Sequence, residues 1–196
     1  MGPTSLIDEL QANLNFGERE MLLLIARRSI VHGFELGSAM ELDADGYPDA
    51  LRVLKGCFVT LFLEDDLRGC VGCLRARGPL VQEVARAAYS AAFRDPRFPP
   101  VCRDEVRQVR VHVSVLSDPV EVRCESESEL MSRLRPGVDG VILSEGAKLG
   151  TFLPDVWEKF PEPSEFLRQL RVKAGLPPSY WSHTLKVERY TTEAFG

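Results

Sequence analysis

The chain has 196 residues, of which 44% are hydrophobic and 27% are charged, and its formal net charge is −5. This composition is typical of a globular protein with a sizeable core, and the scattered arginines argue against a protein that binds nucleic acid. The start of the chain lacks a basic segment followed by an apolar stretch, and no apolar run reaches membrane-spanning length. We therefore expect a cytoplasmic protein whose five cysteines stay reduced.

The first half of the chain predicts two helices with a strand-rich segment between them. Apolar residues recur at helical spacing over residues 18–31, with Gly33 as the expected stop, and residues 37–52 are loop-like. The run 56–63 is rich in aromatic and β-branched residues, which predicts a strand. Pro79 opens the second helix, which ends near Phe93.

The second half alternates strands with short helices. Residues 109–116 alternate strictly, with valines on one face, which predicts a half-buried strand. Ser126 and Glu129 form a capping-box pattern that opens a helix through Leu134. The remaining elements are strands at 138–143, 151–154 and 184–190 and a helix capped by Ser164 and ended by Gly175. Hairpins and helices without a βαβ rhythm predict an α+β fold, with a mainly antiparallel sheet flanked by helices.

The strand 56–63 and the segment after it form a predicted β-hairpin. A three-residue loop, Glu64 to Asp66, pairs Leu63 with Leu67, and it then sets Thr60 opposite Cys70 and Cys57 opposite Cys73. Alternation divides the side chains between two faces. The expected core face carries Cys57, Val59, Leu61, Leu63, Leu67, Val71 and Cys73, and the other face carries Phe58, Thr60, Phe62, Arg68 and Cys70.

Cys70 is the candidate functional thiol. Gly69 and Gly72 remove neighbouring side chains, which allows a ligand to come close and also permits a kink. Arg68, expected on the same face, favours a thiolate or holds an anionic ligand. The alternative is that Cys70 is a small buried residue, as free cysteines often are.

The spacing of Cys70 and Cys73 also suggests a redox pair or half of a zinc site. Residues three apart in a strand point to opposite faces, whereas both kinds of site need convergent thiols. The other cysteines and the three histidines show no second close pair with metal-site spacing. We therefore expect no metal ligands here.

A proline-rich turn follows the second predicted helix and contains Arg94, Asp95 and Arg97. Proline reduces the ordering cost of the turn, so these side chains form either a preorganised cluster beside a pocket or a capped turn with solvated arginines. His112 shares a strand face with Arg110 and Ser114 and is a weak candidate for a general base.

The hexapeptide from Leu67 to Gly72 resembles the signature of the AMMECR domain family, with valine at position 71 where isoleucine is usual. The family's other blocks are resembled in the right order by residues 56–60, 91–100 and 114–116, by Gly140 with the strand after it, and by residues 151–156 and 166–181. The resemblance implies a single α+β domain over residues 17–190, after an N-terminal extension at 1–16. It further implies a larger and a smaller intertwined subdomain, with the hexapeptide near the cleft between them.

Similar prokaryotic proteins are called AmmeMemoRadiSam system protein A, and they accompany a Memo-like protein and a radical S-adenosylmethionine protein. The resemblance therefore implies these two partners, a suspected site, no particular reaction and no known cofactor. Two function classes stay open. One is a module that binds a partner protein or small metabolite around Leu67 to Gly72. The other is an enzyme that uses Cys70 as a nucleophile on a small anionic substrate, with Arg68, Arg94 and Arg97 holding the anion and Thr60 and His112 handling protons.

Overall fold

The computed structural model describes residues 14–196, and these divide into two compact units. The first unit contains the described residues up to Leu116 together with Glu193–Gly196, and the second spans Ser117–Thr192. The expected α+β class is confirmed, with two four-stranded sheets in place of one. The single domain at 17–190 and the extension at 1–16 stay predictions, and residues 1–13 lie outside the described part.

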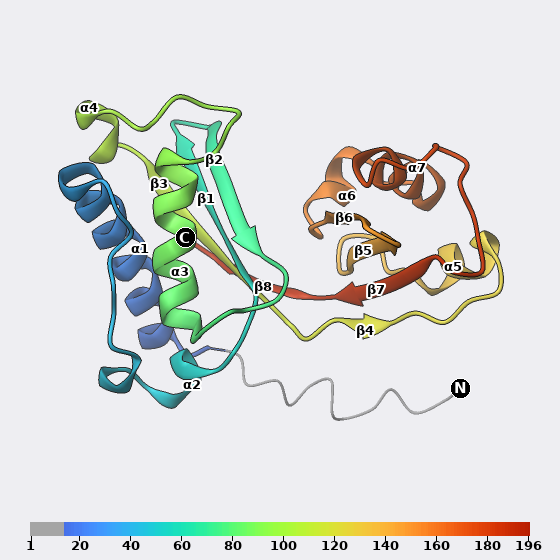
Figure 1. Cartoon of the computed structure of the whole chain (residues 1–196), viewed down its shortest axis with the longest axis horizontal. Coiled ribbons are helices and arrows are strands. Elements are labelled where there is room, and N and C mark those ends of the chain that lie inside the picture. The colour runs from blue at the N-terminus through green and yellow to red at the C-terminus, as the bar shows by residue number, and fades with distance from the viewer. Residues whose placement is uncertain (1–13) are drawn as a thin grey trace. The chain divides into compact units, whose positions relative to one another are not determined.

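The first unit packs helices on one face of a sheet with the strand order β2-β1-β3-β8. Figure 1 shows α1 and α3 together on one side of this sheet. Its elements are α1 (Phe16–Leu36), the 3-10 turn η1 (Ala44–Gly46), α2 (Asp49–Arg52), β1 (Cys57–Leu63), β2 (Asp66–Cys73), α3 (Leu80–Phe93), α4 (Arg103–Val106), β3 (Arg110–Leu116) and β8 (Thr192–Phe195).

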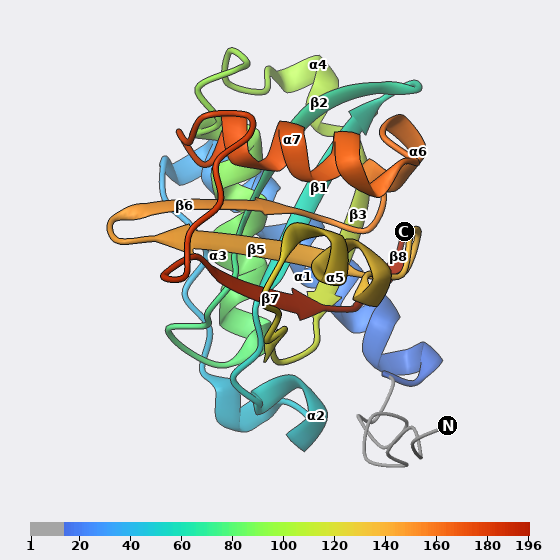
Figure 2. The same cartoon turned by 90° about the vertical axis from the view of Figure 1, so that its right-hand side faces the viewer.

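The second unit has the strand order β4-β7-β5-β6, and Figure 2 shows β7, β5 and β6 side by side. Trp157 and Phe166 stack in its core with ring centroids 3.7 Å apart, and Val141 and Val187 pack in the same cluster from the sheet. Its elements are β4 (Val120–Glu121), α5 (Glu127–Arg133), β5 (Gly140–Glu145), β6 (Lys148–Phe152), α6 (Val156–Lys159), α7 (Pro163–Lys173) and β7 (Lys186–Tyr190).

Helix α1 begins as its sequence requires and ends later than expected. Asn15 accepts a hydrogen bond from the Glu18 amide, and the Glu18 carboxylate accepts from the Asn15 amide, which completes a capping box. The prediction that Gly33 stops the helix is wrong. A Cβ at Gly33 would lie 2.5 Å from the Tyr89 ring, so this glycine allows α1 to approach α3. The helix ends at Gly37, whose φ of 72° suits glycine.

Two smaller predictions about helix starts are corrected. Ser164 lies inside the first turn of α7, because Pro163 occupies the first helical position and Glu162 the cap. Ser126 does cap α5 by accepting from the Glu129 amide, but the Glu129 carboxylate accepts from the Glu125 amide and leaves the box half complete.

The β1–β2 hairpin has the expected register at its open end and a different one near its turn. Thr60 faces Cys70 and Cys57 faces Cys73, as expected. The predicted pairing of Leu63 with Leu67 is wrong: Leu63 faces Asp66, and the register shifts between Leu61 and Phe62. Arg68 is the extra residue of this β-bulge.

The bulge changes which way the residues near the turn point. Leu67 faces Phe62 and is 41% exposed, so its expected place on the core face is wrong. Beyond the bulge, Cys57, Val59 and Leu61 are fully buried as expected. Cys73 is only half-buried, which corrects its assignment to the core.

Candidate functional site

Three chemically useful side chains form one row across the first sheet. Thr60 of β1 faces Cys70 of β2 on one side and His112 of β3 on the other. All three are half-buried, and their positions alternate with the buried valines that contact α1 and α3. The sheet therefore brings Cys70, Thr60 and His112, residues from three separate strands, onto its outer face, meaning the face opposite these two helices. We call them the Cys70–Thr60–His112 row.

The row is connected at one end by a direct contact. The Thr60 hydroxyl donates a hydrogen bond to the Cys70 sulfur at 3.3 Å. The His112 ring packs edge-on against Phe62, with the ring centroids 5.2 Å apart. Neighbouring strands lie about 4.8 Å apart, so the Cys70 and His112 backbones are separated by about 10 Å. His112 thus shares the surface with the thiol without being its hydrogen-bond partner.

The backbone of Cys70 is held by the turn that follows α3. The Cys70 amide donates to Asp95 Oδ2 at 2.9 Å, and the Cys70 carbonyl accepts from Arg97 Nη2 at 3.1 Å. The same Arg97 nitrogen donates to Asp95 Oδ2 at 2.7 Å, which closes a ring of hydrogen bonds. Because β2 lies at the edge of its sheet, Asp95 and Arg97 take the place of a neighbouring strand.

The negative charge of Asp95 strengthens the hydrogen bonds that hold the Cys70 backbone. Asp95 is 5% exposed, and hydrogen bonds from the Arg97 guanidinium hold the pKa of its carboxyl far below the usual value of 3.8. The amide of Cys70 acts in the same direction, against the cost of burial. Asp95 is therefore ionised throughout the physiological range, and Cys70 is held in a fixed position. Both interpretations of the proline-rich turn hold in part: Asp95 caps the turn by accepting from the Arg97 amide at 3.1 Å, and it also forms a cluster with the Arg97 guanidinium. A pocket beside the turn stays a prediction.

Arg68 performs a structural task at the bulge. Its guanidinium makes a two-pronged ion pair with Glu105 of α4, at 2.8 and 2.9 Å. Arg68 is 9% exposed, and it holds the pKa of Glu105 at about 2. The expectation that Arg68 points the same way as Cys70 fails, because the bulge interrupts the alternation between them.

The two glycines of the hexapeptide are surrounded by protein atoms. A Cβ at Gly69 would lie 2.1 Å from the Ala91 carbonyl oxygen of α3. A Cβ at Gly72 would lie 2.1 Å from the Cys57 carbonyl oxygen and 2.6 Å from the Phe58 ring. Both glycines therefore permit close packing within the first unit, and their contact with a ligand stays a prediction.

Two more charged residues lie near the hexapeptide or the proline-rich turn: Arg94, which the sequence analysis singled out, and Glu105, which it did not. Arg94 is exposed at the end of α3, and its guanidinium lies 5.9 Å from the centre of the Tyr89 ring. Glu105, which the sequence did not single out, is the partner of Arg68; its capping-box position three residues after Cys102 was the available signal. Within residues 14–196 there is no group of three or more His, Cys, Asp or Glu side chains placed to hold a metal ion.

Across the part of the chain that the structure covers, no helix combines the length and the apolar character needed to cross a bilayer.

Comparison with known proteins gives a consistent result. The sequence profile of the AMMECR1 family matches residues 23–195. A protein of Methanothermobacter thermautotrophicus is 38% identical over 186 residues, covering 94% of this chain and 96% of its own length. Protein MK0488 of Methanopyrus kandleri is also 38% identical, covering 86% of this chain and 82% of its own length.

A solved structure has the same architecture. The crystal structure of the uncharacterized protein PH0010 from Pyrococcus horikoshii superposes with a TM-score of 0.82 at 35% sequence identity. The match covers 90% of this chain and 89% of PH0010.

Proposed function

The chain belongs to the AMMECR1 family, and from that premise we propose that it is a binding protein that presents the Cys70–Thr60–His112 row to a small metabolite or a partner protein. The row offers a soft sulfur, a hydroxyl and an imidazole on one half-buried surface. Phe62 beside it adds an aromatic ring. A few polar groups among apolar ones are typical of a site that binds an organic molecule.

The observation that carries this proposal is that the charged residues around the hexapeptide bind other groups of the protein. Asp95 and Arg97 bind one another and the Cys70 backbone, and Arg68 binds Glu105. These groups hold the site in one geometry before any ligand arrives, which lowers the ordering cost of binding. Because these residues are bonded to other protein groups, they support recognition by a rigid surface.

The alternative is a thiol-dependent enzyme with Cys70 as nucleophile on a small anionic substrate. Such an enzyme needs a base within hydrogen-bond reach of the sulfur and a cation placed for the substrate. The Cys70 sulfur accepts a hydrogen bond from the Thr60 hydroxyl and interacts with the Arg97 guanidinium, and neither of these groups is a base. His112 lies two strands away, and the three candidate cations, Arg68, Arg94 and Arg97, contact other protein groups. These arrangements favour binding over covalent catalysis.

The family resemblance also supports candidates for the partner. We include in the proposal a Memo-like protein and a radical S-adenosylmethionine protein as physiological partners, and the cytoplasm as the location. No cofactor is part of the proposal.

The test is ligand capture by the full chain. The wild-type protein and the variants Cys70→Ala, Thr60→Val and His112→Ala are incubated with a cytoplasmic metabolite extract and with each candidate partner, and bound species are identified by native mass spectrometry. The proposal expects one species to be retained by the wild type and lost from at least two row variants. Cys102→Ala is the matched control, because Cys102 is an exposed thiol on another element. Equal retention by all variants would exclude the row as the binding site.

A further inference from the structure

A second pair of cysteines faces the interior side of the same hairpin. Cys57 of β1 and Cys73 of β2 are direct neighbours in the strand register. Facing residues of an antiparallel pair have Cα atoms about 4.5–5.5 Å apart, which falls within the range of about 4.4–6.8 Å that a disulfide spans. Both thiols are free. The backbone therefore places them at a separation that a disulfide bridges without a change of fold.

The two thiols differ in their access to solvent. Cys57 is fully buried in the core of the first unit. Cys73 is half-buried and lines a pocket of about 240 Å³ between β2 and α3. An oxidant that enters this pocket reaches Cys73 and not Cys57.

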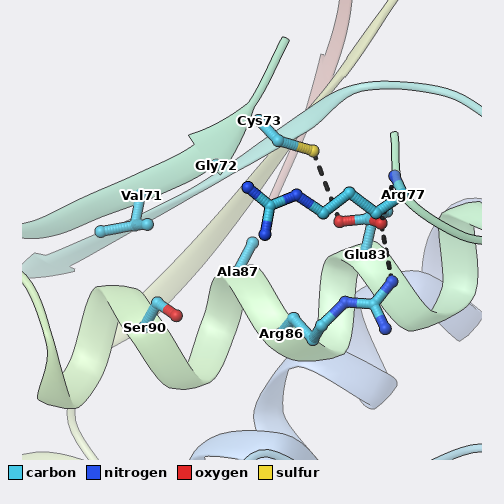
Figure 3. Close-up of a pocket in the computed structure, with 8 residues that line it drawn as sticks. All are labelled: Val71, Gly72, Cys73, Arg77, Glu83, Arg86, Ala87 and Ser90. Atoms are coloured by element: carbon cyan, nitrogen blue, oxygen red, sulfur yellow. Dashed lines mark hydrogen bonds and ion pairs between the residues drawn. The ribbon is translucent and has the colours of Figure 1, made fainter. Parts of the chain in front are cut away.

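The pocket surrounds the Cys73 sulfur with charged groups, as Figure 3 shows. The sulfur donates to Glu83 Oε2 at 3.4 Å, and Glu83 is in turn bound by Arg86 at 2.6 Å. The Arg77 amide donates to the same carboxylate, and the Arg77 side chain lies among the lining residues. The two guanidinium groups make the pocket net positive despite Glu83.

The two thiols also differ in their ease of ionisation. Hydrogen bonds from the Cys57 thiol and backbone lower the pKa of Cys73, and they outweigh the opposing effects of burial and Glu83. The hydrogen bond to Cys73 and full burial raise the pKa of Cys57 well above its ordinary value. The accessible thiol is therefore the more acidic of the two and the buried thiol the less acidic, which is the division that a two-step thiol oxidation requires.

We propose that Cys73 is a modification site for hydroperoxides and that Cys57 resolves the oxidised sulfur into a reversible Cys57–Cys73 disulfide. In the first step the Cys73 sulfur attacks the hydroperoxide, an S–O bond forms and the O–O bond breaks. The leaving alkoxide or hydroxide takes up the thiol proton, and its developing charge is stabilised by the arginines of the pocket. Cys73 is then a sulfenic acid.

In the second step the Cys57 sulfur attacks the Cys73 sulfur. The S–S bond forms, the S–O bond breaks, and hydroxide leaves as water with the Cys57 proton. Two thiols have lost two electrons and two protons, and the hydroperoxide has been reduced to an alcohol and water. This site lies on the face of the sheet opposite the Cys70–Thr60–His112 row and does not rest on the function proposed for that row.

The experiment maps the disulfide in the full chain. The reduced protein is treated with hydrogen peroxide, blocked with N-ethylmaleimide and digested with trypsin without reduction. Trypsin cleaves after Lys55, Arg68 and Arg75, so Cys57 lies in peptide 56–68, whereas Cys70 and Cys73 share peptide 69–75. A Cys70→Ser chain leaves Cys73 as the sole thiol of the second peptide, and fragment ions of the wild-type cross-link assign the sulfur without any substitution.

The proposal expects these two peptides to be cross-linked in the wild-type, Cys70→Ser and Cys102→Ser chains and to be separated by dithiothreitol. The number of maleimide adducts falls by two from the five free thiols. Cys57→Ala removes the cross-link and leaves a sulfenic acid at Cys73 that dimedone traps. Oxidation of the exposed Cys102 without any cross-link between these peptides would overturn the proposal, as would a cross-link from Cys57 to a cysteine other than Cys73.

Discussion

Cys70 and Cys73 are three residues apart, and the strand turns them to opposite faces of one sheet. The Cys70 sulfur contacts the Thr60 hydroxyl on the outer face, and the Cys73 sulfur lies beside Cys57 and Glu83 on the interior face. The short sequence therefore supplies two thiols with different surroundings. Because of the odd spacing, the two sulfurs do not converge on one point, as a zinc site or a redox pair needs.

The first residue-scale prediction concerns the ionisation of Cys73. Replacing Cys57 by alanine removes the thiol hydrogen bond that lowers the pKa of Cys73. Because alkylation requires the thiolate, the rate of Cys73 alkylation should reach its midpoint at a higher pH in Cys57→Ala than in the wild type. The measurement is the pH profile of iodoacetamide labelling with and without Cys57→Ala in a Cys70→Ser chain, in which Cys73 is the sole thiol of peptide 69–75. An unchanged midpoint would show that Cys57 does not stabilise the thiolate.

The second residue-scale prediction concerns the support of Cys70. Asp95→Ala leaves the Cys70 amide and the Arg97 guanidinium without their acceptor. A lost hydrogen bond to a charged group typically costs about 1.5–3 kcal/mol, so the free energy of unfolding in urea should fall by about that amount. Arg94→Ala, on an exposed neighbour, is the control and should change stability by less than about 0.5 kcal/mol. Similar losses in both variants would argue against a specific role for Asp95.

At the scale of elements, the bulge in β2 is what joins the hairpin to α4. It frees Arg68 from the alternation of the strand, and Arg68 then pairs with Glu105. Sequence alone predicted the facing pairs Thr60–Cys70 and Cys57–Cys73 from an assumed three-residue turn, and these pairs are correct because a turn one residue shorter and a bulge of one residue offset each other. It missed the bulge, since Glu64 adopts a φ of 55° and shortens the turn by one residue. The residue types of the loop do not predict a positive φ at Glu64, because glycine and asparagine are the residues that favour it.

The sequence predicted the residues of the candidate site better than their arrangement in the sheet. His112 and Cys70 were chosen separately for their chemistry, and the topology β2-β1-β3 sets them in one row. A single sequence specifies the face of each strand and not the order of strands in the sheet. Thr60 was predicted opposite Cys70 because the two strands are joined by a short turn, whereas β3 follows β1 only after α3 and α4.

The element-scale prediction uses the pH dependence of the Arg68–Glu105 pair. Glu105 has a folded-state pKa of about 2, below its ordinary value of 4.5. The carboxylate binds its proton more weakly when folded, so the pair stabilises the fold above about pH 4.5, and the contribution is lost as pH falls towards 2. Arg68→Ala should therefore lower the free energy of unfolding at pH 7 by about 1.5–3 kcal/mol.

The pH series supplies the check on that prediction. The difference between wild type and Arg68→Ala should shrink as the pH is lowered from 5 to about 2. Urea unfolding at several pH values measures this difference. Arg103→Ala, on the same helix as Glu105, is the control. A difference that stays constant over this range would contradict the role of the ion pair.

At the scale of the whole molecule, the chain returns to its first unit at its C-terminal end. Figure 1 shows β8 running back to the first sheet, and Glu193–Gly196 belong to that unit. Glu193 accepts from Arg19 at 2.7 Å and from the Leu14 amide at 3.0 Å, and Phe195 packs against the first core. The second unit is thus an insertion between β3 and β8.

The whole-molecule prediction follows from this connectivity. Deleting residues 193–196 removes contacts of the first unit alone, so amide hydrogen exchange in β3 should accelerate by about tenfold or more, equivalent to about 1.4 kcal/mol. Exchange in β5 and β7 should stay unchanged, because their core is separate. The measurement is residue-resolved exchange by NMR. Equal acceleration in both sheets would mean that the two units unfold together.

In the proposed function, the protein recognises its ligand or partner at the Cys70–Thr60–His112 row. The most direct measurement is the alkylation rate of Cys70 with and without the captured ligand or partner, with Cys102 in the same sample as the internal reference. We expect bound ligand to slow the labelling of Cys70 and to leave the labelling rate of Cys102 unchanged. Equal labelling of Cys70 in the free and bound protein would contradict it.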